Sequence, residues 1–248
     1  MLRLHHPSGF RGGAKGFLVR YAAMRPMFFV ITGTDTGVGK TVLTAWLARH
    51  LRARGVAVAA LKPVASSNRD DARVLQAALG GALSLDEINP WHFRAPLAPL
   101  IAARMENKSV KFREVVSHIR NVRKRFETVI VEGAGGLLSP LGEKFNSRDC
   151  LLALRAKPIL VCTNRLGAIN QALLVLNSLP KKAARKLQIV LMTPRRTNAA
   201  SRSNLKLLTE FIEPSQLHLL PWLSRAKKVC LDHRVRKVLD EIIKPSTL

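Results

Sequence analysis

A glycine-rich stretch at residues 33–41 holds the residue types that bind phosphate. It reads Gly-Thr-Asp-Thr-Gly-Val-Gly-Lys-Thr, follows the apolar run 28–31 and precedes a segment with helical character. This order of strand, glycine loop, Gly-Lys-Thr and helix is what a phosphate-binding loop requires. Glycines let backbone N–H groups close around phosphate oxygens, and a helix N-terminus favours an anion. We expect phosphate contacts from Gly37, Val38, Gly39, Lys40, Thr41 and Val42.

Two side chains of this loop have defined chemical roles. Lys40 would reach the β- and γ-phosphates of a nucleotide, and the Thr41 hydroxyl would ligate Mg²⁺. The spacing is looser than usual, because five residues separate Gly33 from Gly39 where the common motif has four. An ordinary glycine-rich turn is the alternative, but the surrounding strand and helix favour phosphate binding.

Composition bounds the class of protein. The chain has 248 residues, which suits one domain with a large core, and its apolar runs are too short for a membrane span of roughly 18–20 residues. Its three cysteines, Cys150, Cys162 and Cys230, are far apart and lack metal-ligand spacing. Such cysteines are typical of reduced thiols, so we expect a cytoplasmic protein.

The charge is strongly positive, with 41 basic and 16 acidic residues and a net charge of +25. Basic proteins attract nucleic acid non-specifically. Here the basic residues are spread along the chain, and clusters such as 120–125 and 181–186 fall at expected helix ends and loops. We interpret most of them as solvated faces and do not expect a specific nucleic-acid site.

Residues 1–26 differ from the rest, because they carry five basic residues and no acidic one. A transit peptide would be arginine-bearing and acid-poor, but it would also be rich in serine and amphipathic, which this segment is not. Translation from Met27 is another interpretation. We expect a disordered, dispensable basic arm and a single domain over 27–248.

From Met27 onward, apolar strands alternate with helices. We expect helix 109–125 to be capped by Ser109 and residues 85–100 to be irregular. Strands that are apolar throughout and separated by helices predict an α/β fold of three layers, in which a mostly parallel sheet has helices on both faces, as in P-loop NTPases. The expected strands are 27–33, 56–61, 128–131, 158–163, 187–192 and 217–220, and the expected helices are 40–54, 71–79, 109–125, 147–155, 167–179, 201–212 and a basic one near the C-terminus.

Polar residues follow several of these strands, at the edge where such sheets bind ligands. Lys62 ends a buried strand, where an unpaired ammonium costs several kcal/mol unless an anion meets it. Glu132 also ends a strand and could complete a Mg²⁺ shell with Thr41, with another oxygen from Asp71. Each residue alone could equally form a structural salt bridge, but their convergence at one edge favours a ligand site. The same edge should hold Ser66, residues 133–136, Asn164, Arg165, Met192, Thr193, Pro221 and Trp222.

Seven stretches of the chain together resemble the dethiobiotin synthetase family. The resemblance covers about residues 27–225, and the five-residue gap in the phosphate loop is itself the family's form. The stretches are 33–41, Lys-Pro-Val-Ala-Ser at 62–66, Asp-Ala at 71–72, Asn-Pro at 89–90, Val-Glu-Gly-Ala-Gly-Gly at 131–136, Leu-Gly-Ala-Ile-Asn at 166–170 and Pro-Trp-Leu at 221–223.

The resemblance implies a reaction and its participants. Members convert diaminopelargonate, carbon dioxide and ATP to dethiobiotin, ADP and phosphate, with Mg²⁺, through a carbamate and a carbamic-phosphoric anhydride. Phosphoryl transfer of this kind depends on positioning and charge neutralisation. The family is homodimeric, and the partner subunit helps to bind the carboxylate of the substrate.

The resemblance also implies residue roles. Lys40, Lys62 and Thr36 would be catalytic, and Thr36, Lys62 and Ser66 would contact the diamine or its carbamate. Gly167 and Asn170 open a helix whose N-terminus suits the substrate carboxylate. Thr41, Asp71 and Glu132 would hold Mg²⁺, and further nucleotide contacts would come from Gly133, Ala134, Gly135, Pro221, Trp222 and Leu223.

One departure leaves alternatives open. Met192 stands where the family usually has an asparagine that recognises adenine, so nucleotide preference is undecided and a degenerate synthetase is conceivable. A cobyrinate-amidating enzyme would need a glutaminase domain, for which the chain has no room. A DNA-binding partition ATPase usually has an extra lysine early in its phosphate loop, where Thr34 and Asp35 stand here.

Overall fold

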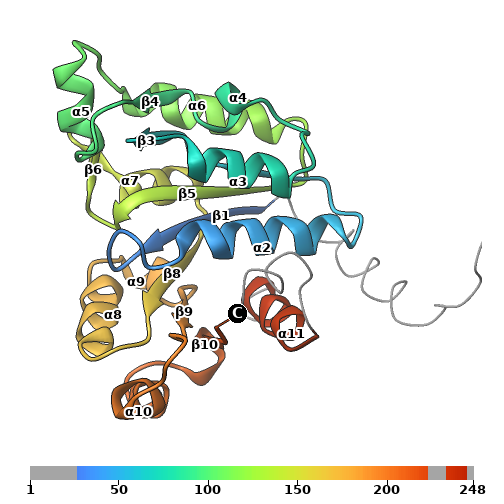
Figure 1. The fold of residues 1–248 in the computed structure, drawn as a ribbon, viewed down its shortest axis with the longest axis vertical. Coiled ribbons are helices and arrows are strands. Elements are labelled where there is room, and N and C mark those ends of the chain that lie inside the picture. Colours follow the sequence, from blue (N-terminus) through green and yellow to red (C-terminus); the bar gives the residue numbers. More distant parts are fainter. Residues whose placement is uncertain (1–26, 223–232, 245–248) are drawn as a thin grey trace, which may run out of the picture.

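A computed structural model describes residues 27–222 and 233–244 (Figure 1). The expected basic arm at 1–26 and the predicted nucleotide contact Leu223 lie outside the described residues. Within the described ranges, no helix combines the length and the apolar character that crossing a membrane demands.

Six strands form one central sheet in the order β10-β9-β8-β1-β5-β2, and every neighbouring pair is parallel. This confirms the predicted parallel α/β fold. The first strand lies in the interior of the sheet, so the loop after it opens at the centre of the carboxyl edge. The strands are β1 Met27–Gly33, β2 Val58–Leu61, β5 Thr128–Gly136, β8 Lys157–Thr163, β9 Gln188–Met192 and β10 Leu217–Leu220.

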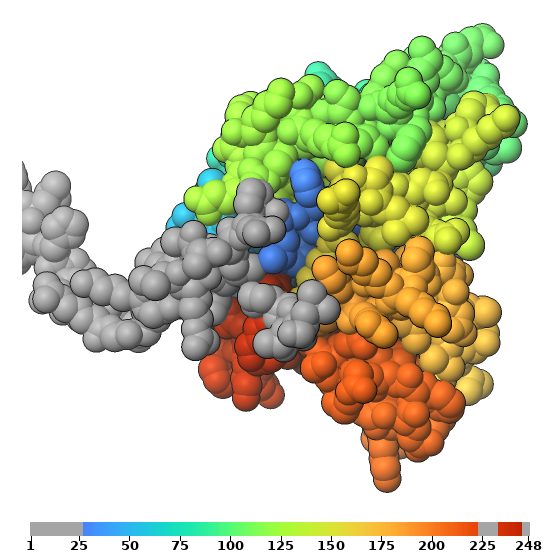
Figure 2. Space-filling model, turned by 180° about the vertical axis from the view of Figure 1, so that it is seen from behind, coloured from blue at the N-terminus to red at the C-terminus, as the bar shows by residue number. Residues whose placement is uncertain are grey.

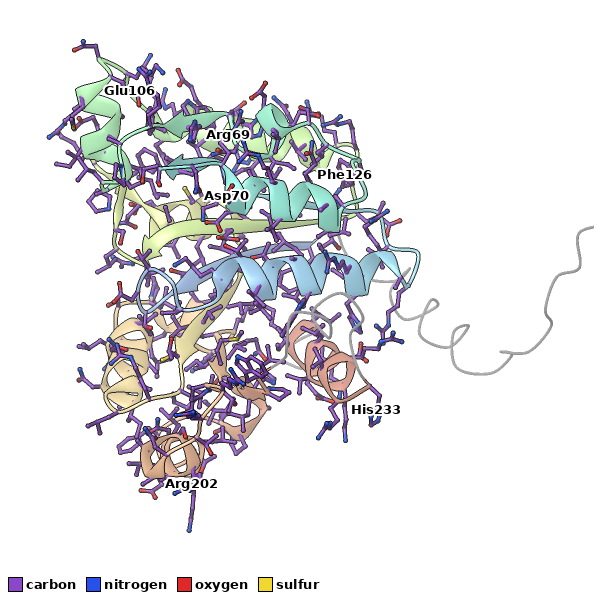
Figure 3. All side chains as sticks on the ribbon, in the orientation of Figure 1. Arg69, Asp70, Glu106, Phe126, Arg202 and His233 are labelled. Carbon is purple, nitrogen blue, oxygen red and sulfur yellow. The ribbon has the colours of Figure 1, made fainter. Side chains whose placement is uncertain are left out.

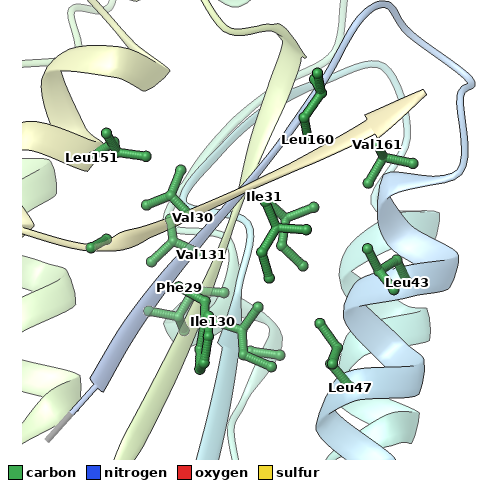
Figure 4. Close-up of a cluster of buried hydrophobic side chains, with 14 of the residues drawn as sticks. Phe29, Val30, Ile31, Leu43, Leu47, Ile130, Val131, Leu151, Leu160 and Val161 are labelled. Carbon is green, nitrogen blue, oxygen red and sulfur yellow. The ribbon is translucent and has the colours of Figure 1, made fainter. Parts of the chain in front are cut away.

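Helices cover both faces of the sheet, which is why its strands are apolar throughout. In Figure 4, Leu43 and Leu47 of α2 (Lys40–Arg52) lie on one side of the strands, and Leu151 of α7 (Ser147–Leu154) lies on the other. Buried Phe29, Val30 and Ile31 of β1 fill the layer between them. The helices α3 (Asp70–Ala78) and α11 (His233–Ile243) pack beside α2, and α6 (Phe112–Arg123) packs beside α7.

Three further helices lie at the β8–β10 end of the sheet (Figure 1). They are α8 (Ala168–Asn177), α9 (Lys181–Ala184) and α10 (Ala199–Leu208). A single 3₁₀ turn, Pro214–Gln216, leads into β10.

The segment 85–100 is more regular than expected. It contains α4 (Leu85–Ile88), β4 (Trp91–Phe93) and the start of α5 (Pro99–Met105), and β4 pairs in parallel with β3 (Val64–Ser66). The prediction of an irregular segment was therefore wrong. Non-local bonds order it, because the buried Asn89 amide donates to the carbonyl of Lys62 at 2.8 Å and to that of Pro63 at 3.3 Å.

The predicted cap Ser109 was also wrong. The helix α6 begins at Phe112, and Lys111 precedes it with extended backbone. Val110 is buried, so the chain between Ser109 and the helix is drawn into the core before the helix starts. A small antiparallel pair, β6 (Pro140–Gly142) and β7 (Phe145–Asn146), was not foreseen and leads into α7.

The helix α11 is fixed at the amino edge of the sheet by buried polar contacts. Lys157 Nζ donates to the carbonyls of Ile242 at 3.0 Å and Lys244 at 2.7 Å, at the C-terminal end of this helix. His50 Nε2 contacts Asp240 Oδ1 at 2.8 Å, and Arg54 pairs with the same carboxylate. The basic helix expected near the C-terminus thus belongs to the folded core.

Candidate active site

The phosphate loop joins β1 to α2 in a conformation that depends on its glycines. Gly37 and Gly39 have positive φ angles of 75° and 104°, which side chains with a Cβ rarely adopt. A Cβ on Gly33 would lie 3.0 Å from Lys40 Nζ, so the lysine passes directly over the loop. Lys40 Nζ donates to the Asp35 carbonyl at 2.7 Å, which holds the ammonium at the mouth of the loop.

Four polar side chains from four segments meet beside this loop. Thr41 Oγ1 donates to Glu132 Oε1 at 2.7 Å, and Lys62 Nζ donates to the same oxygen at 2.9 Å. Lys62 also donates to Asp71 Oδ2. Asp71 lies in the first turn of α3, just after Arg69 and Asp70, which Figure 3 labels above β5. The predicted cluster of Thr41, Lys62, Asp71 and Glu132 is therefore present.

Burial and opposite charges set the protonation of this cluster. Burial alone would lower the pKa of Lys62, but the negative charges of Glu132 and Asp71 outweigh it, so this pKa is raised. Burial would raise the pKa of Asp71, but the charge of Lys62 and its hydrogen bond lower it. Burial lowers the pKa of Lys40, and Glu132 opposes that shift only in part. Lys62 thus remains an ammonium group at neutral pH.

A cavity of ≈ 900 Å³ opens over the loop and the cluster. It brings together most of the residues predicted to bind nucleotide, metal and substrate, as expected for the carboxyl edge of the sheet. Predicted residues that line it are Thr36, Gly37, Gly39, Lys40, Thr41, Val42, Lys62, Ser66, Asp71, Glu132, Ala134 and Gly135.

A second cavity of ≈ 480 Å³ lies at the ends of β9 and β10. Pro221 and Trp222 line it together with Thr193, and the guanidinium of Arg195 lies 5.5 Å from the centre of the Trp222 ring. Met192 is not part of its lining. Its side chain instead reaches the phosphate loop, because a Cβ on Gly39 would lie 3.1 Å from Met192 Cε.

Several predicted residues do not line the large cavity. Gly167 and Asn170 are at the start of α8 and line neither cavity. Val38 is buried in the core, and Gly133 packs against Ser147. Asn164, expected at the ligand edge, is fully buried and donates to the Ser201 carbonyl at 2.8 Å, so it ties the β8 loop to α10.

Other lining residues were missed. The turn 96–99 closes one side of the large cavity, and Ser66 Oγ donates to the Leu97 carbonyl. This turn reaches the site through the β3–β4 pairing, which no local sequence pattern indicated. Ser139 also lines the cavity and accepts from the Gly136 N–H at 2.8 Å. Its position just after the glycine-rich stretch 133–136 could have suggested it.

The donor set suits Mg²⁺. Thr41, Asp71 and Glu132 offer only oxygen atoms, which Mg²⁺ prefers, and the hydroxyl and one carboxylate already touch. Among the described residues, no group of three or more His, Cys, Asp or Glu side chains could hold a metal ion.

Fold and loop together define a nucleotide-binding α/β domain, and a family model described as an AAA domain matches residues 28–228. Solved structures agree on the fold. A chain of the MinC:MinD cell division complex of Aquifex aeolicus is 13% identical with a TM-score of 0.54, covering 87% of this chain and 93% of that one. A putative plasmid partition protein of Borrelia burgdorferi, bound to AMPPNP, is 9% identical with a TM-score of 0.53, covering 88% and 97%. At these identities the similarity shows the fold alone.

Curated relatives narrow the family. ATP-dependent dethiobiotin synthetase BioD of Bacillus velezensis is 32% identical over 218 residues, which are 86% of this chain and 94% of that protein. The enzyme of the same name from Anaeromyxobacter sp. is 42% identical over 172 residues, which are 68% of this chain and 76% of that protein. The enzyme from Akkermansia muciniphila is 40% identical over 162 residues, which are 65% of this chain and 76% of that protein. The chain belongs to the ATP-dependent dethiobiotin synthetase family, a family of ligases.

Proposed function

We propose that this protein is a dethiobiotin synthetase. It closes the ureido ring of dethiobiotin from 7,8-diaminopelargonate and carbon dioxide, and it converts ATP to ADP and phosphate. The observation that carries the proposal is the joining of Thr41, Lys62, Asp71 and Glu132 in one cavity beside the phosphate loop. Membership of the family supports the same reaction.

The loop and Lys40 bind the triphosphate. Backbone N–H groups of residues 37–41 surround the β-phosphate, and the Lys40 ammonium exchanges the Asp35 carbonyl for phosphate oxygens. Thr41, Asp71 and Glu132 would hold Mg²⁺, which would neutralise charge on the transferring phosphoryl group.

Lys62 acts through its positive charge, which its contacts with Glu132 and Asp71 favour. The first amine of the substrate bonds to carbon dioxide and loses a proton, giving a carbamate. A carbamate oxygen attacks the γ-phosphorus, and ADP leaves. The second amine attacks the carbamate carbon, the C–O bond breaks, and phosphate leaves, taking up the proton that this amine loses. Lys62 donates hydrogen bonds to the oxyanions of each step, and Thr36 and Ser66 orient the diamine in the same cavity.

The nucleotide base occupies the second cavity, between Pro221 and Trp222 and the residues after β9. Leu223, the third predicted residue of this group, lies outside the described residues. The described side chains of the cavity include hydroxyl and guanidinium groups but no carboxylate or carboxamide. With Met192 turned onto Gly39, this side of the site does not select adenine through a side-chain amide.

The functional unit is a homodimer that pairs through α8. This helix reads Ala-Ile-Asn-Gln-Ala-Leu-Leu-Val-Leu-Asn, yet only Ala168 and Ala172 are buried, and Leu174 is 59% exposed. Leu166, just before it, is 81% exposed. Figure 2 shows yellow-orange atoms, the colour range that includes α8, at the surface of this face. In the dimer, the helix N-terminus at Gly167 and Asn170 meets the substrate carboxylate in the partner's cavity. Sedimentation should therefore give the mass of two chains.

The protein acts in the cytoplasm. Its two described cysteines, Cys150 and Cys162, are buried free thiols, which a reducing compartment maintains.

Direct turnover tests the proposed function. The purified protein is incubated with diaminopelargonate, bicarbonate, Mg²⁺ and ATP, and dethiobiotin is detected by mass. Product formation with stoichiometric ADP is expected. Lys206→Ala, which removes an exposed lysine far from the cavity, is the matched control for lysine variants and should turn over normally. Absence of dethiobiotin from folded, nucleotide-binding protein would reject the proposal.

A further inference from the structure

A small cavity lies behind the active site, between β5 and the helices α6 and α7. Its volume is ≈ 10 Å³, at the lower end of the roughly 10–15 Å³ that a cavity needs to hold one water molecule. Most of its lining is apolar, from residues such as Val30, Val115 and Ile119. Glu132 and Ser147 are the lining residues with polar side-chain oxygens.

Both of these residues have a buried oxygen without a partner, namely Glu132 Oε2 and Ser147 Oγ. The side chain of Glu132 is fully buried. Its other oxygen, Oε1, faces the large cavity, where it accepts from Thr41 and Lys62. A buried oxygen of an ionised group that lacks a partner costs roughly 1–3 kcal/mol or more. Glu132 Oε2 would therefore be stabilised by a hydrogen-bond donor.

The Ser147 hydroxyl is available for this role because α7 does not need it. The helix is capped by Asn146, whose side chain accepts from the backbone N–H groups of Arg148 and Asp149, and by Asp149, which accepts from the Asn146 N–H. The hydroxyl instead lies against Gly133, where any Cβ would overlap Ser147 Oγ. Ser147 thus touches the backbone next to Glu132.

We propose that Ser147 is a positioning residue for Glu132 and acts through one buried water that fills this cavity. The water donates to Glu132 Oε2 and exchanges a second hydrogen bond with Ser147 Oγ. This bridge holds the carboxylate in the rotamer that presents Oε1 to Thr41 and Lys62. The water site depends only on the cavity and the two oxygens, whereas its effect on turnover rests on the proposed function.

The test uses Ser147→Ala in the full chain, with Ser203→Ala as the control. Ser203 is an exposed residue of α10 that donates to the Ala199 carbonyl at 3.0 Å, so its loss leaves Glu132 untouched. Mn²⁺ replaces Mg²⁺, and its affinity for the protein–ATP complex is measured by electron paramagnetic resonance. Loss of such an outer partner typically weakens metal binding roughly 10- to 100-fold. We expect a weakening in that range for Ser147→Ala and none for Ser203→Ala.

Turnover and crystallography complete the design. The Mg²⁺ concentration for half-maximal turnover should rise in Ser147→Ala, while the KM for diaminopelargonate changes little. A high-resolution structure of the unmodified protein should show one water between Glu132 and Ser147. Unchanged Mn²⁺ affinity in the variant, or a dry cavity in the crystal, overturns the proposal. If the protein makes no dethiobiotin but Ser147→Ala still loses Mn²⁺ affinity, the proposed function fails and the positioning role survives.

Discussion

Two buried lysines at opposite edges of the sheet differ in the groups that they contact. Lys62 follows β2 at the carboxyl edge and is 7% exposed, and Lys157 opens β8 at the amino edge and is 8% exposed. Lys62 contacts two carboxylates, those of Glu132 and Asp71. Lys157 contacts two backbone carbonyls at the end of α11. The pKa of Lys62 is raised in spite of burial, whereas burial and the charge of Lys186 lower the pKa of Lys157 to about 8.

The difference separates a reactive site from a structural contact. Carbonyl dipoles at a helix C-terminus favour a cation but carry no full charge, so they do not offset the desolvation of the Lys157 ammonium. The carboxylates around Lys62 do offset it, and their negative charge is also what a metal ion needs. The charged groups at the carboxyl edge can therefore bind a ligand, while Lys157 holds α11 against the sheet.

The largest contrast should appear in turnover. Lys62→Ala removes the ammonium that contacts both carboxylates, and loss of one such charged donor typically lowers kcat by roughly 10²–10³. We expect this variant, and Lys40→Ala at the phosphate loop, to lose dethiobiotin formation below detection while circular dichroism shows a folded protein. Lys157→Met should keep most of its activity. Near-normal turnover in Lys62→Ala would show that the role given to this residue is wrong.

Between pH 8 and pH 10, Lys157 should make the stability of the protein depend on pH. Below pH 8 this lysine is protonated in both the folded and unfolded states. Between pH 8 and its ordinary value of 10.5 the folded state has lost the proton and the unfolded state has not, so the free energy of unfolding rises with pH. The stability of the unmodified protein relative to Lys157→Met should therefore increase by about 2 kcal/mol from pH 8 to pH 10. Urea unfolding of both proteins measures it, and parallel pH profiles would contradict it.

The two edges also differ in how far sequence could predict them. The sheet, the phosphate loop and the meeting of Lys62 with Glu132 follow from strand ends in a parallel sheet, which local patterns specify. The β3–β4 pairing, the turn 96–99 and the contact of Lys157 with α11 join segments far apart in the chain. Ser109 was expected to cap α6 because its type suits a cap, but the burial of Val110 overrode that preference.

A smaller effect of pH on stability should come from His218 of β10, which lies near Lys157 of β8. Burial and the positive charge of Lys157 lower the pKa of His218 to about 4, and its Nε2 contacts Gln188 Oε1 at 2.7 Å. As the pH falls below 6.5 the unfolded chain gains a proton that the folded protein does not accept, so stability is lost. Between pH 6.5 and 5 we expect the unmodified protein to lose about 1–2 kcal/mol relative to His218→Gln. Thermal unfolding at both pH values measures this difference, and equal losses would refute it.

The smallest effect should appear within the carboxyl edge itself, where the β9–β10 side lacks the paired charges of the β2–β5 side. Met192 packs on Gly39 and offers no amide to the nucleotide base. GTP and CTP should therefore support ring closure with kcat/KM values within about tenfold of that for ATP. One or two hydrogen bonds to a base contribute roughly that ratio. Met192→Asn adds an amide that can pair with adenine and should raise the preference for ATP about tenfold. Met105→Asn, on an exposed methionine of α5, is the control and should change nothing. A preference for ATP above a hundredfold in the unmodified protein would mean that groups other than side-chain amides read the base, and the contrast between the two sides of this edge would then lie in charge alone.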